Sequence, residues 1–186
     1  MQHRIFIAVN LPENIKKKLS DYESRWPEIP CRWTKRDSLH ITLNFLGYLT
    51  DEELLEIIKI VREIASRHDP FFLNLRSVVY GPKGKPPRMI WTEGETSEEL
   101  GKLREDLAKG LEGFSKESTK EQGYTPHITL GRLKQWEFQK MEPEEKPEVN
   151  EKINFNFEVS SIEIMESELK RNGPEYTVLE SSPLNL

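Results

Sequence analysis

The tetrad His-Ile-Thr-Leu occurs twice in this chain, at residues 40–43 and again at residues 127–130. In a β-strand, successive side chains point to opposite faces of the sheet. Each tetrad therefore places its histidine and its threonine on one face and its two aliphatic side chains on the other, where they can join a core. Each tetrad also follows a predicted strand and a predicted helix, so the sequence favours two halves of shared architecture and divergent detail.

The chain begins with a predicted strand and helix. Residues 4–9 alternate and are rich in Ile, Phe and Val, which predicts a strand. Pro12 suits the first position of a helix, and Pro27 and Pro30 end that helix. The apolar stripe of this helix is Ile15, Leu19, Tyr22 and Trp26.

Two further helices are each predicted to open with a capping box, in which a threonine and a glutamate three residues later satisfy free backbone N–H groups. The pairs are Thr50 with Glu53 and Thr96 with Glu99. The stripe of the first helix is Leu54, Ile58, Val61 and Ala65, and that of the second is Leu100, Leu103, Leu107, Leu111 and Phe114.

The remaining predicted strands cover residues 71–80, 88–92, 153–165 and 176–179. The polar stretch 134–150 contains Pro143 and Pro147, which indicates a long surface loop with a short helical turn. Strand pairs combined with helices predict an α+β fold, with the helices outside an antiparallel sheet.

Composition limits the function classes. The 186 residues fit one domain, or one domain of two lobes, and the net charge of −5 requires any RNA contact to come from a local basic patch. Cys31 is the single cysteine, which excludes an intrachain disulfide and a thiolate zinc site, and it is best interpreted as a packed small residue. The N-terminal apolar run is too short for a signal peptide and no segment is long enough to span a membrane, so we expect a cytoplasmic protein.

Two His-x-Thr strands side by side would point two imidazoles and two hydroxyls into one cleft. A neutral histidine can take a proton from water while a protonated one gives a proton to a leaving oxygen. An imidazole pKa of about 6.5 lets both states coexist near neutral pH. Thr42 and Thr129 can donate hydrogen bonds to phosphate oxygens beside His40 and His127. This chemistry requires neither a metal nor a cofactor.

Arg132, five residues after His127, could add a guanidinium for phosphate. Strict alternation puts Arg132 on the face of Leu130. A bulge beside Gly131 would redirect it, because glycine often marks such a bulge. The matching residue in the first half is Phe45, so an arginine role would be one-sided.

Other polar and aromatic residues have structural as well as functional interpretations. One His-x-Thr pair alone is more often a surface pair, and we interpret His3 as a strand-edge residue and His68 as a helix-end residue. Trp33 and Trp91 could stack on a nucleobase or be half-buried sheet residues, the latter favoured for Trp91. Basic residues that could contact RNA, or simply be solvated, are Lys35, Arg36, Lys83, Lys85 and Arg88.

Paired His-x-Thr strands are the signature of the two-histidine phosphoesterases. The chain resembles the branch of 2′-5′ RNA ligases and RNA 2′,3′-cyclic phosphodiesterases. Four stretches carry the resemblance, which covers nearly the whole chain: RIFIAVNLP at 4–12, SLHITLNFLG at 38–47, PHITLGR at 126–132 and MESELKRNGPEYTVLESSPL at 165–184.

The resemblance implies that residues 1–186 form one bilobal domain, with a cleft between pseudo-symmetric halves. It implies an enzyme that opens RNA 2′,3′-cyclic phosphate ends to 2′-phosphates, with His40 and His127 as the catalytic pair. We also expect a monomer that needs no metal. Thr42, Thr129 and Arg132 would bind the phosphate. We expect His127 to activate water and His40 to protonate the 3′ oxygen.

Three residues are weaker candidates for contacts with the base or the RNA: Trp33, Lys35 and Arg88. Three other functions compete with hydrolysis. They are a nucleotide-binding module without turnover, RNA end-joining as the main task, and a metallohydrolase. The sequence disfavours all three, since both histidines are present and the chain carries neither a nucleotide-activation motif nor metal-ligand spacing.

Overall fold

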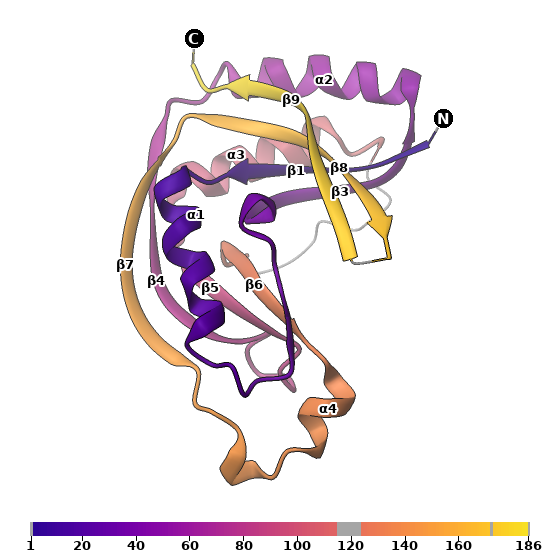
Figure 1. The fold of residues 1–186 in the computed structure, drawn as a ribbon. Coiled ribbons are helices and arrows are strands. Elements are labelled where there is room, and N and C mark those ends of the chain that lie inside the picture. Colours follow the sequence, from indigo (N-terminus) through magenta and orange to yellow (C-terminus); the bar gives the residue numbers. More distant parts are fainter. Residues whose placement is uncertain (1, 115–123, 172, 186) are drawn as a thin grey trace.

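Two antiparallel sheets form the framework of the molecule (Figure 1). The computed structural model describes residues 2–114, 124–171 and 173–185. Sheet A has the strand order β3–β1–β8–β9, and sheet B has the order β2–β6–β5–β4–β7. The strands of sheet A are β1 (Gln2–Asn10), β3 (His40–Thr50), β8 (Ser161–Lys170) and β9 (Gly173–Pro183). The strands of sheet B are β2 (Cys31–Trp33), β4 (Phe71–Gly81), β5 (Met89–Gly94), β6 (His127–Leu133) and β7 (Asn150–Val159).

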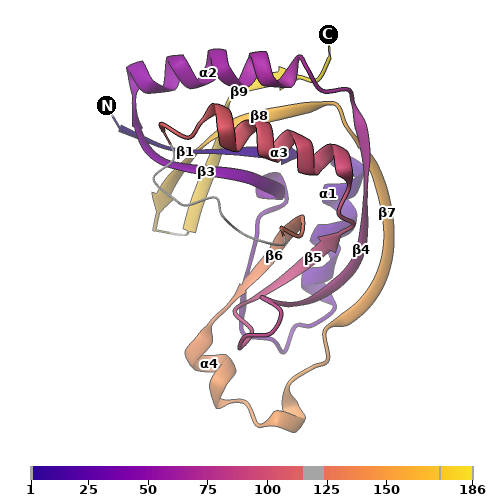
Figure 2. The same cartoon turned by 180° about the vertical axis from the view of Figure 1, so that it is seen from behind.

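The helices lie outside the sheets. Helices α2 (Asp51–Ala65) and α3 (Glu98–Gly110) lie side by side over sheet A, where both contact β3 (Figure 2). Helix α1 (Glu13–Ser20) packs against sheet B, with Lys18 over the ring of Phe155 in β7. One buried apolar cluster contains residues of both sheets and of helices α1, α2 and α3. The predicted α+β fold with antiparallel sheets and outer helices is confirmed.

The helix starts follow from their capping residues. Thr50 and Glu53 form the predicted capping box: the Thr50 hydroxyl accepts from the Glu53 N–H at 3.3 Å, and the Glu53 carboxylate accepts from the Thr50 N–H at 2.7 Å. The box predicted at Thr96 is wrong by one residue. Ser97 caps α3 instead, accepting from the backbone N–H of Leu100 at 3.0 Å. The buried leucines of α3 fix which face of the helix meets the core. In this orientation Ser97 is the last residue with extended backbone before the helix begins.

The first two helices differ in detail from their predicted stripes. Helix α1 ends at Ser20 and continues as the 3-10 turn Asp21–Ser24, so it does not reach Pro27. In α2 the buried residues are Ile57, Val61, Ile64 and Ala65, a face rotated from the predicted one. Residues 134–150 contain the short helix α4 (Gln135–Lys140) and the 3-10 turn Pro143–Glu145, which confirms the predicted helical turn.

The single strand predicted over residues 153–165 is wrong. The chain leaves sheet B at Val159 and enters sheet A at Ser161, with only Ser160 between the two strands. Extended backbone and β-forming side chains run through this crossing, so the sequence pattern contains no break. Within the described residues no helix is long and apolar enough to cross a membrane.

Candidate active site

Both tetrads begin a strand and divide their side chains between two faces as predicted. His40 and Thr42 in β3 are half-buried, as are His127 and Thr129 in β6, and the aliphatic residues between them are buried. We call the His/Thr face of each sheet its site face. Strands β3 and β6 contact each other (Figure 1). The two site faces lie close together, since the charges of His127 and Arg132 act on His40.

Each site strand bulges at the last residue of its tetrad. The ladder between β3 and β1 skips Leu43, and the ladder between β6 and β5 skips Leu130. A bulge residue shifts the alternation that follows it. Phe45 and Arg132 consequently return to the site faces, and both are exposed. The bulge expected beside Gly131 is therefore present, at Leu130.

Both histidine rings are fixed in the same tautomer. His40 Nδ1 lies 2.7 Å from the carbonyl oxygen of Ser38, and His127 Nδ1 lies 3.1 Å from that of Thr125. A carbonyl can only accept, so each Nδ1 carries the proton and donates it. In the neutral rings, Nε2 is then the free base. His40 Nε2 lies 3.2 Å from the Thr42 hydroxyl.

Aromatic rings hold both imidazoles in place. The ring centroid of Phe6 lies 4.9 Å from that of His40. The ring centroid of Tyr176 lies 5.0 Å from that of His40, with an interplanar angle of 81°, so the two rings meet edge to face. On the other sheet, Trp91 lies 4.3 Å from His127. These contacts limit ring rotation and keep the imidazoles partly out of water.

Burial lowers the pKa of His40 to about 4, against the weaker opposing effect of its hydrogen bond to Ser38. The positive charges of Lys16, His127 and Arg132 lower this pKa further. Two conclusions follow. In the free protein His40 is neutral at neutral pH, and the two histidines with Arg132 lie close enough to interact electrostatically.

The model of the 2′-5′ RNA ligase superfamily matches residues 12–171. The chain belongs to this family. An RNA 2′,3′-cyclic phosphodiesterase of Methanocaldococcus jannaschii is 30% identical over 179 residues, covering 95% of this chain and 98% of the relative. One from Thermus thermophilus is 31% identical over 192 residues, covering 97% and 90%.

Solved structures agree with this membership. A crystal structure of a protein from Thermus thermophilus has a TM-score of 0.83 and 31% identity, covering 98% of each chain. Escherichia coli LigT complexed with 3′-AMP has a TM-score of 0.80 at 23% identity, covering all of both chains, and shows the shared fold. The predicted resemblance to this family is thus confirmed.

The other predicted contact residues lie beside β6. Trp33 in β2 is half-buried and packs against the core. Lys35 is exposed and forms an ion pair with Glu175 at 3.7 Å. Arg88 is exposed just before β5, and its backbone N–H donates to Gly81 at 2.7 Å. Their roles toward RNA stay predictions.

The two histidines outside the tetrads have structural partners. His3 contacts Glu166 and Asp51, each at 2.7 Å, and His68 contacts Asp106 at 3.0 Å. In the described parts of the chain, no cluster of three or more His, Cys, Asp or Glu side chains could hold a metal ion.

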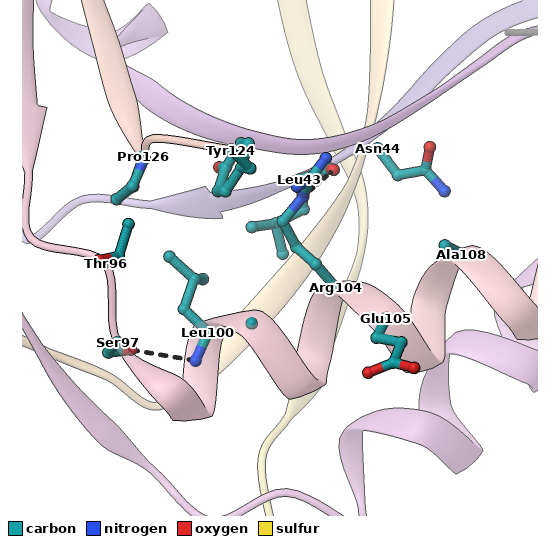
Figure 3. Close-up of a pocket in the computed structure, with 11 residues that line it drawn as sticks. Leu43, Asn44, Thr96, Ser97, Leu100, Arg104, Glu105, Ala108, Tyr124 and Pro126 are labelled. Carbon is teal, nitrogen blue, oxygen red and sulfur yellow. Dashed lines mark hydrogen bonds between the residues drawn. The ribbon is translucent and has the colours of Figure 1, made fainter. Parts of the chain in front are cut away.

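The sequence did not reveal the residues that brace β3 from the edge opposite β1. The Tyr124 hydroxyl donates to the Thr42 carbonyl at 2.8 Å, and Arg104 Nε donates to the Leu43 carbonyl at 3.1 Å (Figure 3). The guanidinium lies 3.5 Å above the Tyr124 ring. A cavity of about 380 Å³ adjoins this brace, and its lining contains neither site histidine. The bulged part of β3 is therefore held by Arg104 of α3 and by Tyr124, both distant from β3 in sequence.

Proposed function

We propose that this chain hydrolyses 2′,3′-cyclic phosphate ends of RNA to 2′-phosphates by general acid–base catalysis, without a metal ion. The observation that carries the proposal is the matched pair of imidazoles, His40 and His127, each donating through Nδ1 to a backbone carbonyl. The names of the relatives, RNA 2′,3′-cyclic phosphodiesterases, support this substrate class.

In the proposed reaction, His127 Nε2 takes a proton from water as the water oxygen bonds to phosphorus. The bond from phosphorus to the 3′ oxygen breaks, and His40 gives that oxygen a proton. The product is a 2′-phosphate with a free 3′ hydroxyl. Proton exchange with solvent then restores both histidines.

Three side chains would stabilise the negative charge that builds up on the phosphate. The hydroxyls of Thr42 and Thr129 share the site faces with the histidines, and Arg132 reaches the same face through the bulge at Leu130. Donors already in position stabilise a transition state without having to reorganise during the reaction. Arg132 has no counterpart on sheet A, where Phe45 takes its place.

The acid role of His40 requires a proton that the free protein holds poorly at neutral pH. A cyclic phosphate is an anion, and a negative charge close to an imidazole raises its pKa. Substrate binding would also offset the charge of Arg132, one of the groups that lower the pKa of His40. We therefore infer that His40 gains its proton with the substrate.

The test is incubation of the protein, in EDTA, with a short RNA that ends in a 2′,3′-cyclic phosphate. The parent should form a 2′-phosphate, whereas His40→Ala and His127→Ala should form it at only a small residual rate, about 10²- to 10⁴-fold lower. His68→Ala is the matched control and should behave as the parent, because His68 pairs with Asp106 instead of lying in the site.

Each alternative has its own result. RNA that binds but stays intact indicates a binding module. Joined products in excess over hydrolysis indicate end-joining as the main task. Loss of activity in EDTA would disprove metal independence, and a 3′-phosphate product would reverse the proposed bond cleavage.

A further inference from the structure

The proposed reaction leaves one arginine beside the site without a role. Strand β2 pairs with β6 so that Arg32 lies directly opposite Arg132. Residues directly opposite one another on antiparallel strands point to the same face. Arg132 is on the site face of sheet B, so Arg32 is on that face as well.

Two arginines directly opposite each other destabilise a strand pair. Both are exposed, and across the described residues neither guanidinium forms an ion pair; Arg132 has a weak contact at 3.5 Å with the Met89 sulfur. Lys35, three residues after Arg32, differs in that it forms an ion pair with Glu175. A bound anion would relieve the repulsion that this pair of strands otherwise carries.

Arg32 also reaches from sheet B toward sheet A. Its Cδ and Nη1 atoms lie 3.9 and 4.0 Å from the position that a Cβ atom on Gly173 would occupy. Gly173 begins β9, the strand whose Tyr176 contacts His40. The Arg32 side chain therefore lies at the border between the two site faces.

The position of Arg32 is distinct from that of the reacting phosphate. Arg132 is already five residues along β6 from His127, and Arg32 lies on the next strand outward. Neighbouring strands are about 4.8 Å apart. An anion held by Arg32 thus lies farther from the histidines than Arg132 does. The next phosphate of a nucleotide chain would lie in such a position.

We propose that Arg32 binds the phosphodiester on the 5′ side of the terminal nucleotide, with Arg132 between this phosphate and the reacting one. The inference rests on the proposed function and refines its substrate class: the chain acts on oligonucleotides in preference to nucleoside 2′,3′-cyclic monophosphates. An arginine suits this role because its planar guanidinium can donate two parallel hydrogen bonds to one phosphate.

The test compares three substrates that share the same cyclic end. One is a nucleoside 2′,3′-cyclic monophosphate, the second is the dinucleotide with one upstream phosphodiester, and the third is that dinucleotide with a neutral methylphosphonate linkage. The proteins are the parent, Arg32→Gln, Arg32→Lys and the control Arg62→Gln. Arg62 is an exposed arginine of α2 that pairs with Glu180.

We expect Arg32→Gln to lower kcat/KM for the dinucleotide by about 10- to 100-fold, the range for a lost hydrogen bond to a charged group. Arg32→Gln should leave kcat/KM for the mononucleotide unchanged. Arg32→Lys should lower kcat/KM for the dinucleotide less than Arg32→Gln does. With the methylphosphonate dinucleotide, kcat/KM of the parent should fall by about the same factor. Arg32→Gln should lower kcat/KM for this substrate no further. In Arg32→Gln, the slope of log kcat/KM for the dinucleotide against log salt concentration should also become shallower by about 0.7.

Two results would overturn the subsite: an equal loss on the mononucleotide and the dinucleotide, or no loss on either. Failure of the proposed function has a different signature, because the parent would then open none of the three substrates. In that case the equilibrium Kd decides. Binding that is weaker both with the neutral linkage and in Arg32→Gln supports the subsite. A Kd that changes with neither refutes it.

Discussion

Leu43 and Leu130 are the residues at which the two site strands bulge, and each lies three positions after a site histidine. The two halves therefore share a backbone irregularity as well as a tetrad. Two residues later the halves differ: the shared bulge presents Phe45 on sheet A and Arg132 on sheet B. A symmetric backbone thus carries an asymmetric pair of side chains.

This asymmetry predicts unequal effects at two matched positions. Arg132→Gln should lower kcat/KM on a cyclic-phosphate RNA by about 10- to 100-fold, because a guanidinium bonded to a charged phosphate is lost. Phe45→Leu should have a smaller effect on kcat/KM, since Phe45 offers the phosphate no donor. Steady-state kinetics, with circular dichroism as the folding control, would check both. Equal losses would contradict the one-sided role.

Tyr176 should act on His40 through its ring. Its edge meets the imidazole, and such aromatic pairs contribute about 0.5–1.5 kcal/mol beyond burial. Tyr176→Phe keeps this contact and should keep activity, whereas Tyr176→Ala should lower activity and raise the pKa of His40 by admitting water. NMR titration of His40 in both variants measures the pKa. A large loss of activity in Tyr176→Phe would instead assign a role to the hydroxyl.

The tetrads predicted much of the site because their information is local. Alternation alone places His40 and Thr42 on one face, and a glycine beside Leu130 was enough to suggest the bulge that turns Arg132. These features depend on neighbours within a few residues. The capping box at Thr50 was predictable for the same reason.

The missed features depend on contacts between distant segments. Arg32 meets Arg132 only because the three-residue strand β2 pairs with β6, and nothing near Arg32 in the sequence marks that strand. Tyr124 reaches the Thr42 carbonyl across 82 positions. The change of sheet at Ser160 was missed because sheet membership is decided by pairing partners, whereas the local pattern stays extended.

The depressed pKa of His40 predicts acid sensitivity. Its value in the folded protein is about 4 and its ordinary value is 6.5, so between these pH values the unfolded chain binds more protons. Stability then rises with pH in this window and falls on acidification. Urea unfolding from pH 7 to pH 4 should show this fall in the parent and a weaker one in His40→Gln. An unchanged slope in the variant would contradict the assignment.

His3 supplies a control of opposite sign. Hydrogen bonds to Glu166 and Asp51 raise its pKa above 6.5. The stability that His3 contributes is therefore fully present at pH values below 6.5 and is lost as pH rises through its folded pKa. His3→Gln should accordingly remove a gain in stability on acidification above pH 6.5 and leave the slope below pH 6.5 unchanged, whereas His40→Gln flattens the fall below pH 6.5.

The residual activity of His127→Ala should report the acid role of His40. With the proposed base removed, the pH dependence of kcat/KM reflects the remaining group in the free protein. If His40 is the acid, residual kcat/KM falls about tenfold per pH unit above a pKa of about 4, as its protonated fraction falls. Activity that rises through this pH and then stays level would make His40 the base.

Gly81 is predicted to support His127 through Trp91. A Cβ atom at Gly81 would collide with the indole of Trp91, whose centroid lies 4.3 Å from that of His127. Gly81→Ala should therefore displace both rings and lower both stability and kcat/KM. Gly101→Ala is the matched control, because a Cβ at this exposed position in α3 meets no atom within 4 Å and should stabilise the helix by about 0.5–1 kcal/mol. Thermal unfolding and kinetics of both variants separate the effects. Full activity in Gly81→Ala would show that His127 keeps its position without this support.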